Sequence, residues 1–130
     1  IMNIAIVVSE FNEEITSRML EVAKEKANSM QLTISHVCMV PGAYDMPILV
    51  DRLLQNQNID GVATLGAIIK GQTKHDEVIS HAAARSLTDL SLKSNDFQFT
   101  VSSYNKTSIT LFESIPFLFN SKINSPLILF

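Results

Sequence analysis

The chain has 130 residues, 46% of them hydrophobic, and a formal net charge of −3. A chain of this length buries roughly two-thirds of its unfolded surface, which is enough for one domain with a substantial core. Without a basic excess there is no electrostatic case for nucleic-acid binding. The one cysteine, Cys38, cannot form an internal disulfide, so a reducing compartment is expected. No signal peptide and no apolar run of about 20 residues is evident, which indicates a soluble cytoplasmic protein without membrane contacts.

Short apolar runs alternate with amphipathic stretches over the first part of the chain. The runs "NIAIVV", "LTISHVCMV" and "IDGVATLGAII" are predicted strands, and the first, a continuous β-branched run, is typical of a strand buried on both faces of a parallel sheet. Each is followed by apolar residues at helical spacing, and Asn12, Asp45 and Thr73 are the predicted N-caps of the three helices. Three strand–helix repeats predict a layered α/β fold with right-handed crossovers.

Residues 94–130 have a different composition. They contain no glycine, alanine, methionine or arginine, yet they hold six of the seven phenylalanines. The alternating stretch "FQFTV" predicts a fourth strand, and "TSITLF" and "PFLFN" also resemble strands, whereas no amphipathic helix is indicated. We therefore describe one domain with a body of residues 1–93 and a divergent tail of residues 94–130. One hypothesis is that the tail is an out-of-frame or otherwise altered translation, which the coding nucleotides would test.

The segments "SEFN", "VPGAYD" and "GQTKH" each follow one of the three predicted strands. In a parallel α/β sheet these segments emerge together at the carboxyl edge, where ligands usually bind. Each segment is weak evidence alone, but their shared position predicts a site at this edge.

The stretch "GQTKH" has two interpretations. Thr73 and Asp76 form a T-x-x-D capping pattern, so the stretch could simply begin a helix and carry a surface histidine. The same helix start directs free N–H groups at the loop, and Gly71 leaves room for a phosphate to approach. His75 would lie in the first helical turn, where the helix dipole favours a neutral imidazole able to accept or donate a proton.

The other candidates also have structural alternatives. Phe11 could stack on a planar ligand or belong to the core. Asp45 could accept hydrogen bonds from hydroxyls or only cap its helix. Gly42 suggests a special backbone geometry, His36 a structural role and Cys38 a packed, inert thiol. The sequence has no metal-ligand spacing, dinucleotide motif or Walker-type loop, so neither a metal nor a cofactor is expected.

The motifs "IVVSEFNEEIT", "VPGAYDMP" and "LGAIIKGQTKHDEV" resemble, in order and spacing, those of the lumazine synthase family. The resemblance extends over about residues 2–93. It implies a flavodoxin-like, three-layer α/β/α sandwich with a four-stranded parallel sheet. It also implies a transferase of riboflavin biosynthesis that condenses 5-amino-6-ribitylamino-uracil with 3,4-dihydroxy-2-butanone 4-phosphate, without cofactor or metal. Active sites in this family lie between the subunits of a homopentamer, which can assemble further into a sixty-subunit shell.

The resemblance assigns roles to residues of all three motifs. For the first substrate it implies that Phe11 stacks on the pyrimidine ring, that Ala43 and Asp45 meet the ribityl chain, and that Ile68 and Ile69 hold the pyrimidine through backbone groups. For the second substrate and the chemistry it implies that Gln72 and Thr73 bind the phosphate and that His75 moves protons. Gly42 is included with the substrate-binding residues.

Two departures from the family pattern stand out. The family usually has glutamate where this chain has Asp45, so the carboxylate reaches about one methylene less far. No counterpart is found in residues 94–130 for the arginine that binds phosphate or the residue that closes a neighbour's pocket. The alternatives are therefore a non-catalytic, oligomeric or shell-forming relative with an impaired phosphate site, an archaeal-type riboflavin synthase, and a simple anion-binding module.

Overall fold

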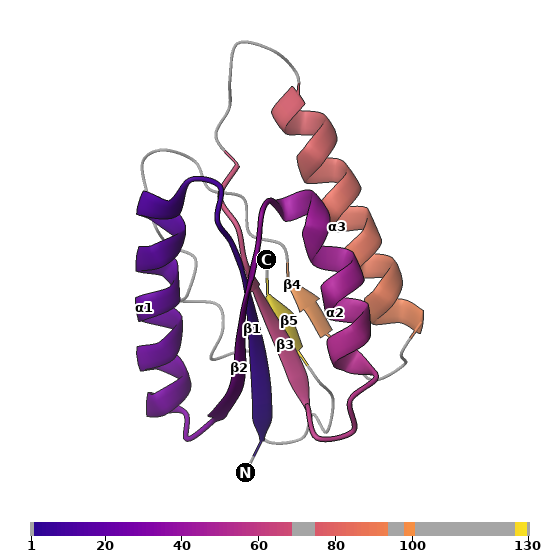
Figure 1. The fold of residues 1–130 in the computed structure, drawn as a ribbon. Helices are drawn as coiled ribbons and strands as arrows, with labels where there is room; N and C mark the ends of the chain where they lie inside the picture. The colour runs from indigo at the N-terminus through magenta and orange to yellow at the C-terminus, as the bar shows by residue number, and fades with distance from the viewer. Residues whose placement is uncertain (1, 69–74, 94–97, 101–126, 130) are drawn as a thin grey trace.

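The computed structural model describes residues 2–68, 75–93, 98–100 and 127–129 (Figure 1). The first strand and helix are β1 (Asn3–Ser9) and α1 (Glu13–Ser29), followed by β2 (Thr33–Val40), a 3₁₀ turn η1 (Ala43–Asp45) and α2 (Met46–Leu54). Next come β3 (Gly61–Leu65), α3 (His75–Lys93) and two short strands, β4 (Gln98–Thr100) and β5 (Leu127–Leu129). The three predicted strand–helix repeats are thus confirmed.

The strands form one parallel sheet in the order β2-β1-β3-β5-β4. Strand β4 lies inside the predicted stretch 97–101. The described residues contain five strands rather than the expected four, because β5 pairs with both β3 and β4. Its pattern of three apolar residues is too short to distinguish a strand from other apolar segments. The predicted strands "TSITLF" and "PFLFN" lie outside the described residues.

Helices cover both faces of the sheet and make a three-layer α/β/α arrangement, as predicted. Figure 1 shows α1 on one face and α2 with α3 on the other. None of the helices in the described part of the chain is long and apolar enough to cross a membrane.

In the described part of the chain, the core consists of two hydrophobic clusters separated by the sheet. Ala5 and Val7 of β1 belong to the cluster with Val50 of α2 and Leu87 of α3. The alternate residues Ile6 and Val8 belong to the cluster on the α1 side, together with Met19, Ala23 and Leu65. Full burial of one such aliphatic side chain stabilises the fold by about 1.5–3 kcal/mol. Burial on both faces explains why "NIAIVV" is a continuous apolar run.

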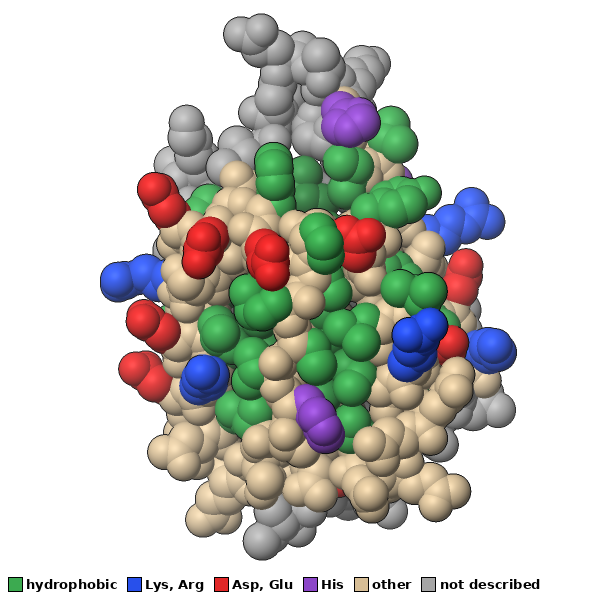
Figure 2. Space-filling model, viewed as in Figure 1, with side chains coloured by type: hydrophobic (Ala, Val, Ile, Leu, Met, Phe, Trp, Pro, Cys, Tyr) green, Lys and Arg blue, Asp and Glu red, His purple; other side chains and the backbone are tan. Residues whose placement is uncertain are grey.

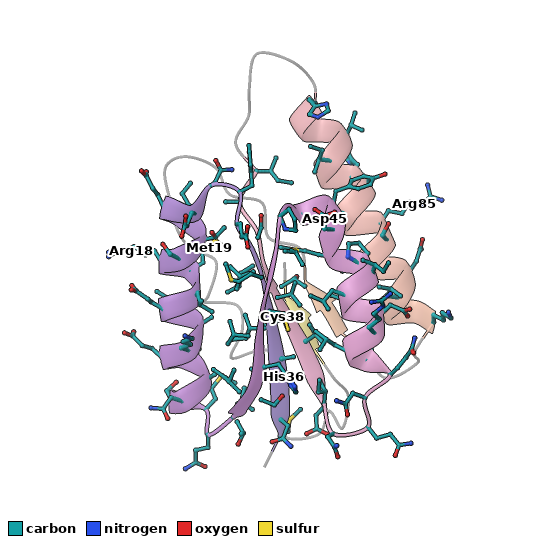
Figure 3. The ribbon with its side chains drawn as sticks, in the orientation of Figure 1. Arg18, Met19, His36, Cys38, Asp45 and Arg85 are labelled. Carbon is teal, nitrogen blue, oxygen red and sulfur yellow. The ribbon has the colours of Figure 1, made fainter. Side chains whose placement is uncertain are left out.

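Strand β2 was predicted as a strand, and the structure shows that it is much more exposed than β1. It lies at the edge of the sheet, and Val37 and Met39 are 41% and 48% exposed. Figure 2 shows hydrophobic side chains gathered on both sides of this strand, between α1 and α2. His36 is exposed, with its Nδ1 3.0 Å from the Ser35 hydroxyl, and Cys38 is half-buried against the α2-side cluster (Figure 3). The apolar residues of a strand do not reveal whether the strand lies inside the sheet or at its edge.

Candidate functional site

The described residues that follow β1, β2 and β3 lie at one end of the sheet, and α3 begins at the same end (Figure 1). Backbone N–H groups of Glu10 and Phe11 donate hydrogen bonds to the carbonyls of Val40 and Pro41, at 2.8 and 3.1 Å. The loop after β1 is therefore bonded directly to the end of β2. This convergence confirms the predicted common edge for the first two motifs and for His75, while the other residues of "GQTKH" lie outside the described residues.

Phe11 lies in the loop between β1 and α1 with 71% of its surface exposed. The core alternative for Phe11 is therefore wrong. An aromatic ring left in water at the carboxyl edge of a parallel sheet is available to stack on a planar ligand.

Asn12 occupies the predicted N-cap position of α1, but its side chain makes no capping hydrogen bond. Its backbone is left-handed, with φ 60° and ψ 47°, and its Nδ2 donates to the carbonyl of Ala67 at 2.7 Å. The capping prediction is thus correct in position and wrong in chemistry. Local spacing could not reveal a partner 55 residues away.

Asp45 was also predicted to cap a helix, but its carboxylate closes the preceding turn instead. Its Oδ2 accepts the N–H of Gly42 at 3.0 Å, while its own N–H donates to the Gly42 carbonyl at 3.1 Å. No side-chain cap is formed on α2, which begins with Pro47 in its first turn. Because Asp45 is exposed and a carboxylate has about four acceptor sites, it retains capacity for a further donor.

Gly42 does not meet the expectation of a special backbone geometry. Its φ of −146° and ψ of 171° are extended values that any residue adopts. Among the described residues, a Cβ at this position would meet only the Asp45 Oδ2, at an ordinary 3.6 Å. The glycine therefore leaves open space beside Asp45. Ala43, the next residue, is buried at the base of the same turn.

Gly66 is a site residue that the sequence reasoning missed. It follows β3, and a Cβ there would lie 3.1 Å from Cε of Met46 and 3.7 Å from Cβ of Ala43. Glycine thus allows the third loop to pack closely against the second. The glycine in "LGAII" is the sequence signal for this residue, because a glycine at the end of a strand often marks a place where another part of the backbone packs closely. Ile68, two residues further on, is half-buried.

His75 is the first residue of α3 and is exposed, so its predicted position in the first turn is confirmed. Ile69, Gln72 and Thr73 lie outside the described residues, as does the proposed cap formed by Thr73. The structure thus brings Phe11, Asp45 and the start of α3 to one edge, and the predicted phosphate contacts stay predictions. Within the described ranges, no group of three His, Cys, Asp or Glu residues could hold a metal ion.

Comparison with known proteins gives a consistent assignment. The family model described as 6,7-dimethyl-8-ribityllumazine synthase matches residues 1–105. A protein of that name from Sulfolobus acidocaldarius is 52% identical over 92 residues, which are 71% of this chain and 58% of the relative. Its namesake from Pyrobaculum arsenaticum is 47% identical over 93 residues, 72% of this chain and 62% of the relative. A third namesake, from Methanocaldococcus jannaschii, is 42% identical over 92 residues, 71% of this chain and 65% of the relative.

The chain thus spans less than two-thirds of the length of these three relatives. The family model extends beyond the predicted body of residues 1–93, and the division of the chain at residue 93 stays a prediction. Since the family model covers most of the chain, the chain belongs to the 6,7-dimethyl-8-ribityllumazine synthase family.

Proposed function

We propose that this chain is a transferase that condenses 5-amino-6-ribitylamino-uracil with 3,4-dihydroxy-2-butanone 4-phosphate to give 6,7-dimethyl-8-ribityllumazine. The observation that carries the proposal is the meeting of Phe11, Asp45 and the His75 end of α3 at one sheet edge, in a chain of this family. The relatives' names favour this reading over an archaeal-type riboflavin synthase. A cytoplasmic location stays a prediction.

The pyrimidine substrate would bind across the first two loops. The exposed ring of Phe11 is free to stack on the uracil, while backbone groups of Ile68 and Ile69 hydrogen-bond its edge. The open space at Gly42 gives the ribityl chain access to the Asp45 carboxylate. A hydrogen bond from a hydroxyl to a charged acceptor contributes about 1.5–3 kcal/mol where water is excluded. Ala43 forms the base of this turn.

The butanone phosphate would bind at the start of α3. Gln72 and Thr73 precede that helix, and its N-terminal N–H groups and dipole favour a phosphate there. His75 lies in the first turn, within the same part of the chain. The site would need neither metal nor cofactor, because the reaction is an amine–ketone condensation, an elimination of phosphate and a ring closure in which the ribitylamino nitrogen adds to the remaining carbonyl carbon and a second water leaves.

His75 would serve as the proton carrier. When the 5-amino nitrogen adds to the ketone carbonyl, the nitrogen gives up both of its protons in turn. The carbonyl oxygen gains two protons and leaves as water, so that a carbon–nitrogen double bond, the Schiff base, replaces the carbon–oxygen bond. Loss of phosphate then requires removal of a carbon-bound proton beside the imine. A neutral imidazole can accept a proton in one step and return it in the other.

The edge strand β2 supports a proposal for assembly. Val37 and Met39 are exposed on β2, and Val22 of α1 and Ile48 of α2 are exposed on the helices. Figure 2 shows hydrophobic side chains on both sides of β2, between α1 and α2. Within the described residues β2 pairs with β1 alone, so its other side is open to another strand. We infer that this edge joins copies of the chain, in a homopentamer or in a larger closed shell.

The test is an assay with both substrates that records the absorbance of the lumazine product. We expect His75→Ala to reduce kcat about 10²–10⁴-fold, as typical for loss of a general acid–base. His81→Ala is the matched control, because His81 is also exposed on α3 and should be silent. No wild-type turnover would overturn the proposal. A folded, inactive oligomer would favour the shell-forming relative.

A further inference from the structure

Asn12 stands between Phe11 and α1 in a conformation that few residues tolerate. Its φ of 60° and ψ of 47° place it in the left-handed region, which favours glycine and, among other residues, asparagine and aspartate. Its carbonyl accepts the N–H groups of Ile15 and Thr16, at 2.9 and 3.1 Å. Helix α1 therefore begins through backbone bonds of Asn12, and the side chain is not used for capping.

The side-chain amide of Asn12 instead joins two loops that are distant in sequence. Its Nδ2 donates to the carbonyl of Ala67 at 2.7 Å, and this contact is half-buried. Ala67 is itself buried in the α1-side cluster, two residues beyond the end of β3. The acceptor is thus held by the core, so the bond fixes the loop after β1 relative to the end of β3.

The two residues next to this bond are both assigned to the pyrimidine. Phe11 immediately precedes Asn12 and is anchored on its other side by the 3.1 Å bond from its N–H to the Pro41 carbonyl. Ile68 immediately follows Ala67. One hydrogen bond thus sets the separation between a ring that would stack on the face of the uracil and a backbone that would bind its edge.

We propose that Asn12 is a positioning residue for the pyrimidine half of the site, acting through Phe11 and Ile68 without touching the substrate. The inference rests on the proposed function. Stacking and edge hydrogen bonds act on the same flat ring, so they reach full strength only when their relative geometry is held. Asparagine tolerates the left-handed backbone conformation, and its side-chain amide can donate a hydrogen bond to the Ala67 carbonyl. Glycine lacks the donor, and aspartate would oppose a carboxylate to the carbonyl oxygen.

The test is calorimetric titration of the intact chain with 5-amino-6-ribitylamino-uracil alone, without the second substrate. Asn12→Gly keeps the backbone conformation and removes the bond. It should weaken uracil binding about three- to tenfold, as expected for loss of one such hydrogen bond. Asn12→Asp, a second variant, should weaken binding at least as much. In the full assay the KM for the uracil should rise, while the KM for the butanone phosphate stays unchanged.

Gln31→Gly is the matched control. Gln31 is the other non-glycine residue with positive φ in the described part of the chain, at 58°, and it follows the opposite end of α1. Its substitution should leave uracil binding unchanged. If the Asn12→Gly variant binds the uracil as tightly as the wild-type protein does, this inference is overturned while the proposed function stands. An equal rise in the KM values for both substrates would also overturn this inference alone. Absence of uracil binding to the wild-type protein would overturn the proposed function and this inference with it.

Discussion

The carboxylate of Asp45 accepts a hydrogen bond from the backbone N–H of Gly42, with an Oδ2–N distance of 3.0 Å. This bond holds the turn after β2 in the shape that presents both residues at the carboxyl edge of the sheet. The bond also occupies one oxygen of the Asp45 carboxylate. The ribityl chain would therefore bind a carboxylate that already accepts a hydrogen bond from its own turn.

Replacement of Asp45 should therefore affect substrate binding more than stability. We expect Asp45→Ala to lower uracil affinity about tenfold or more, because both the substrate contact and the turn bond are lost. The unfolding midpoint should fall by no more than about 4 °C, since the carboxylate is exposed. Calorimetric titration and thermal unfolding measure the two effects. Asp51→Ala is the control, because it removes a 3.2 Å bond to Gln55 on the exposed side of α2; an equal loss of affinity there would contradict the assignment.

Two glycine substitutions should separate folding from binding. Gly66→Ala brings a Cβ to 3.1 Å from the buried Met46 side chain, so we expect a loss of about 1 kcal/mol in the free energy of unfolding. Gly42→Ala meets no such obstacle and should leave stability unchanged or raise it by about 0.4–1 kcal/mol, because alanine restricts the unfolded chain. Denaturant unfolding measures both. Gly42→Ala should nevertheless weaken uracil binding by filling space beside Asp45, and unchanged affinity would show that this space is not used.

Phe11 should contribute to binding and little to the fold. Because its ring is 71% exposed, Phe11→Ala should leave the unfolding midpoint nearly unchanged. Loss of the stacking face should weaken uracil binding by about 1–3 kcal/mol, the range found for bases on aromatic side chains. Phe11→Leu tests the ring specifically, since it keeps apolar bulk without the flat face. If Phe11→Leu binds uracil as tightly as the wild type, stacking is not its role.

The β2 edge should control assembly. Met39→Lys places a charge on an apolar edge strand, so we expect it to dissociate the proposed oligomer into smaller species. Sedimentation velocity of the wild type and the variant measures this. Gln57→Lys is a suitable control, because it adds the same charge at an exposed position between α2 and β3. An oligomer that persists in Met39→Lys would place the subunit contact elsewhere.

The correct predictions are those in which local patterns and the fold agree. Continuous apolar runs and helical spacing located β1 to β3 and α1 to α3, and the parallel arrangement then placed the loops at Phe11, Asp45 and His75 on one edge. The division into a body of residues 1–93 and a divergent tail stays a prediction, since the family model itself extends to residue 105. The altered-translation hypothesis for residues 94–130 stays a hypothesis.

The sequence by itself determined the class of fold, the order of its elements and the edge that carries the candidate site, because these follow from periodicities of a few residues. The tertiary structure decided which partners the polar side chains choose. Asn12 and Asp45 both have the sequence signature of helix caps, yet one bonds Ala67 across the site and the other closes its own turn. It also decided that β2 is an exposed edge, since burial depends on neighbours in space and not on a strand's own residues.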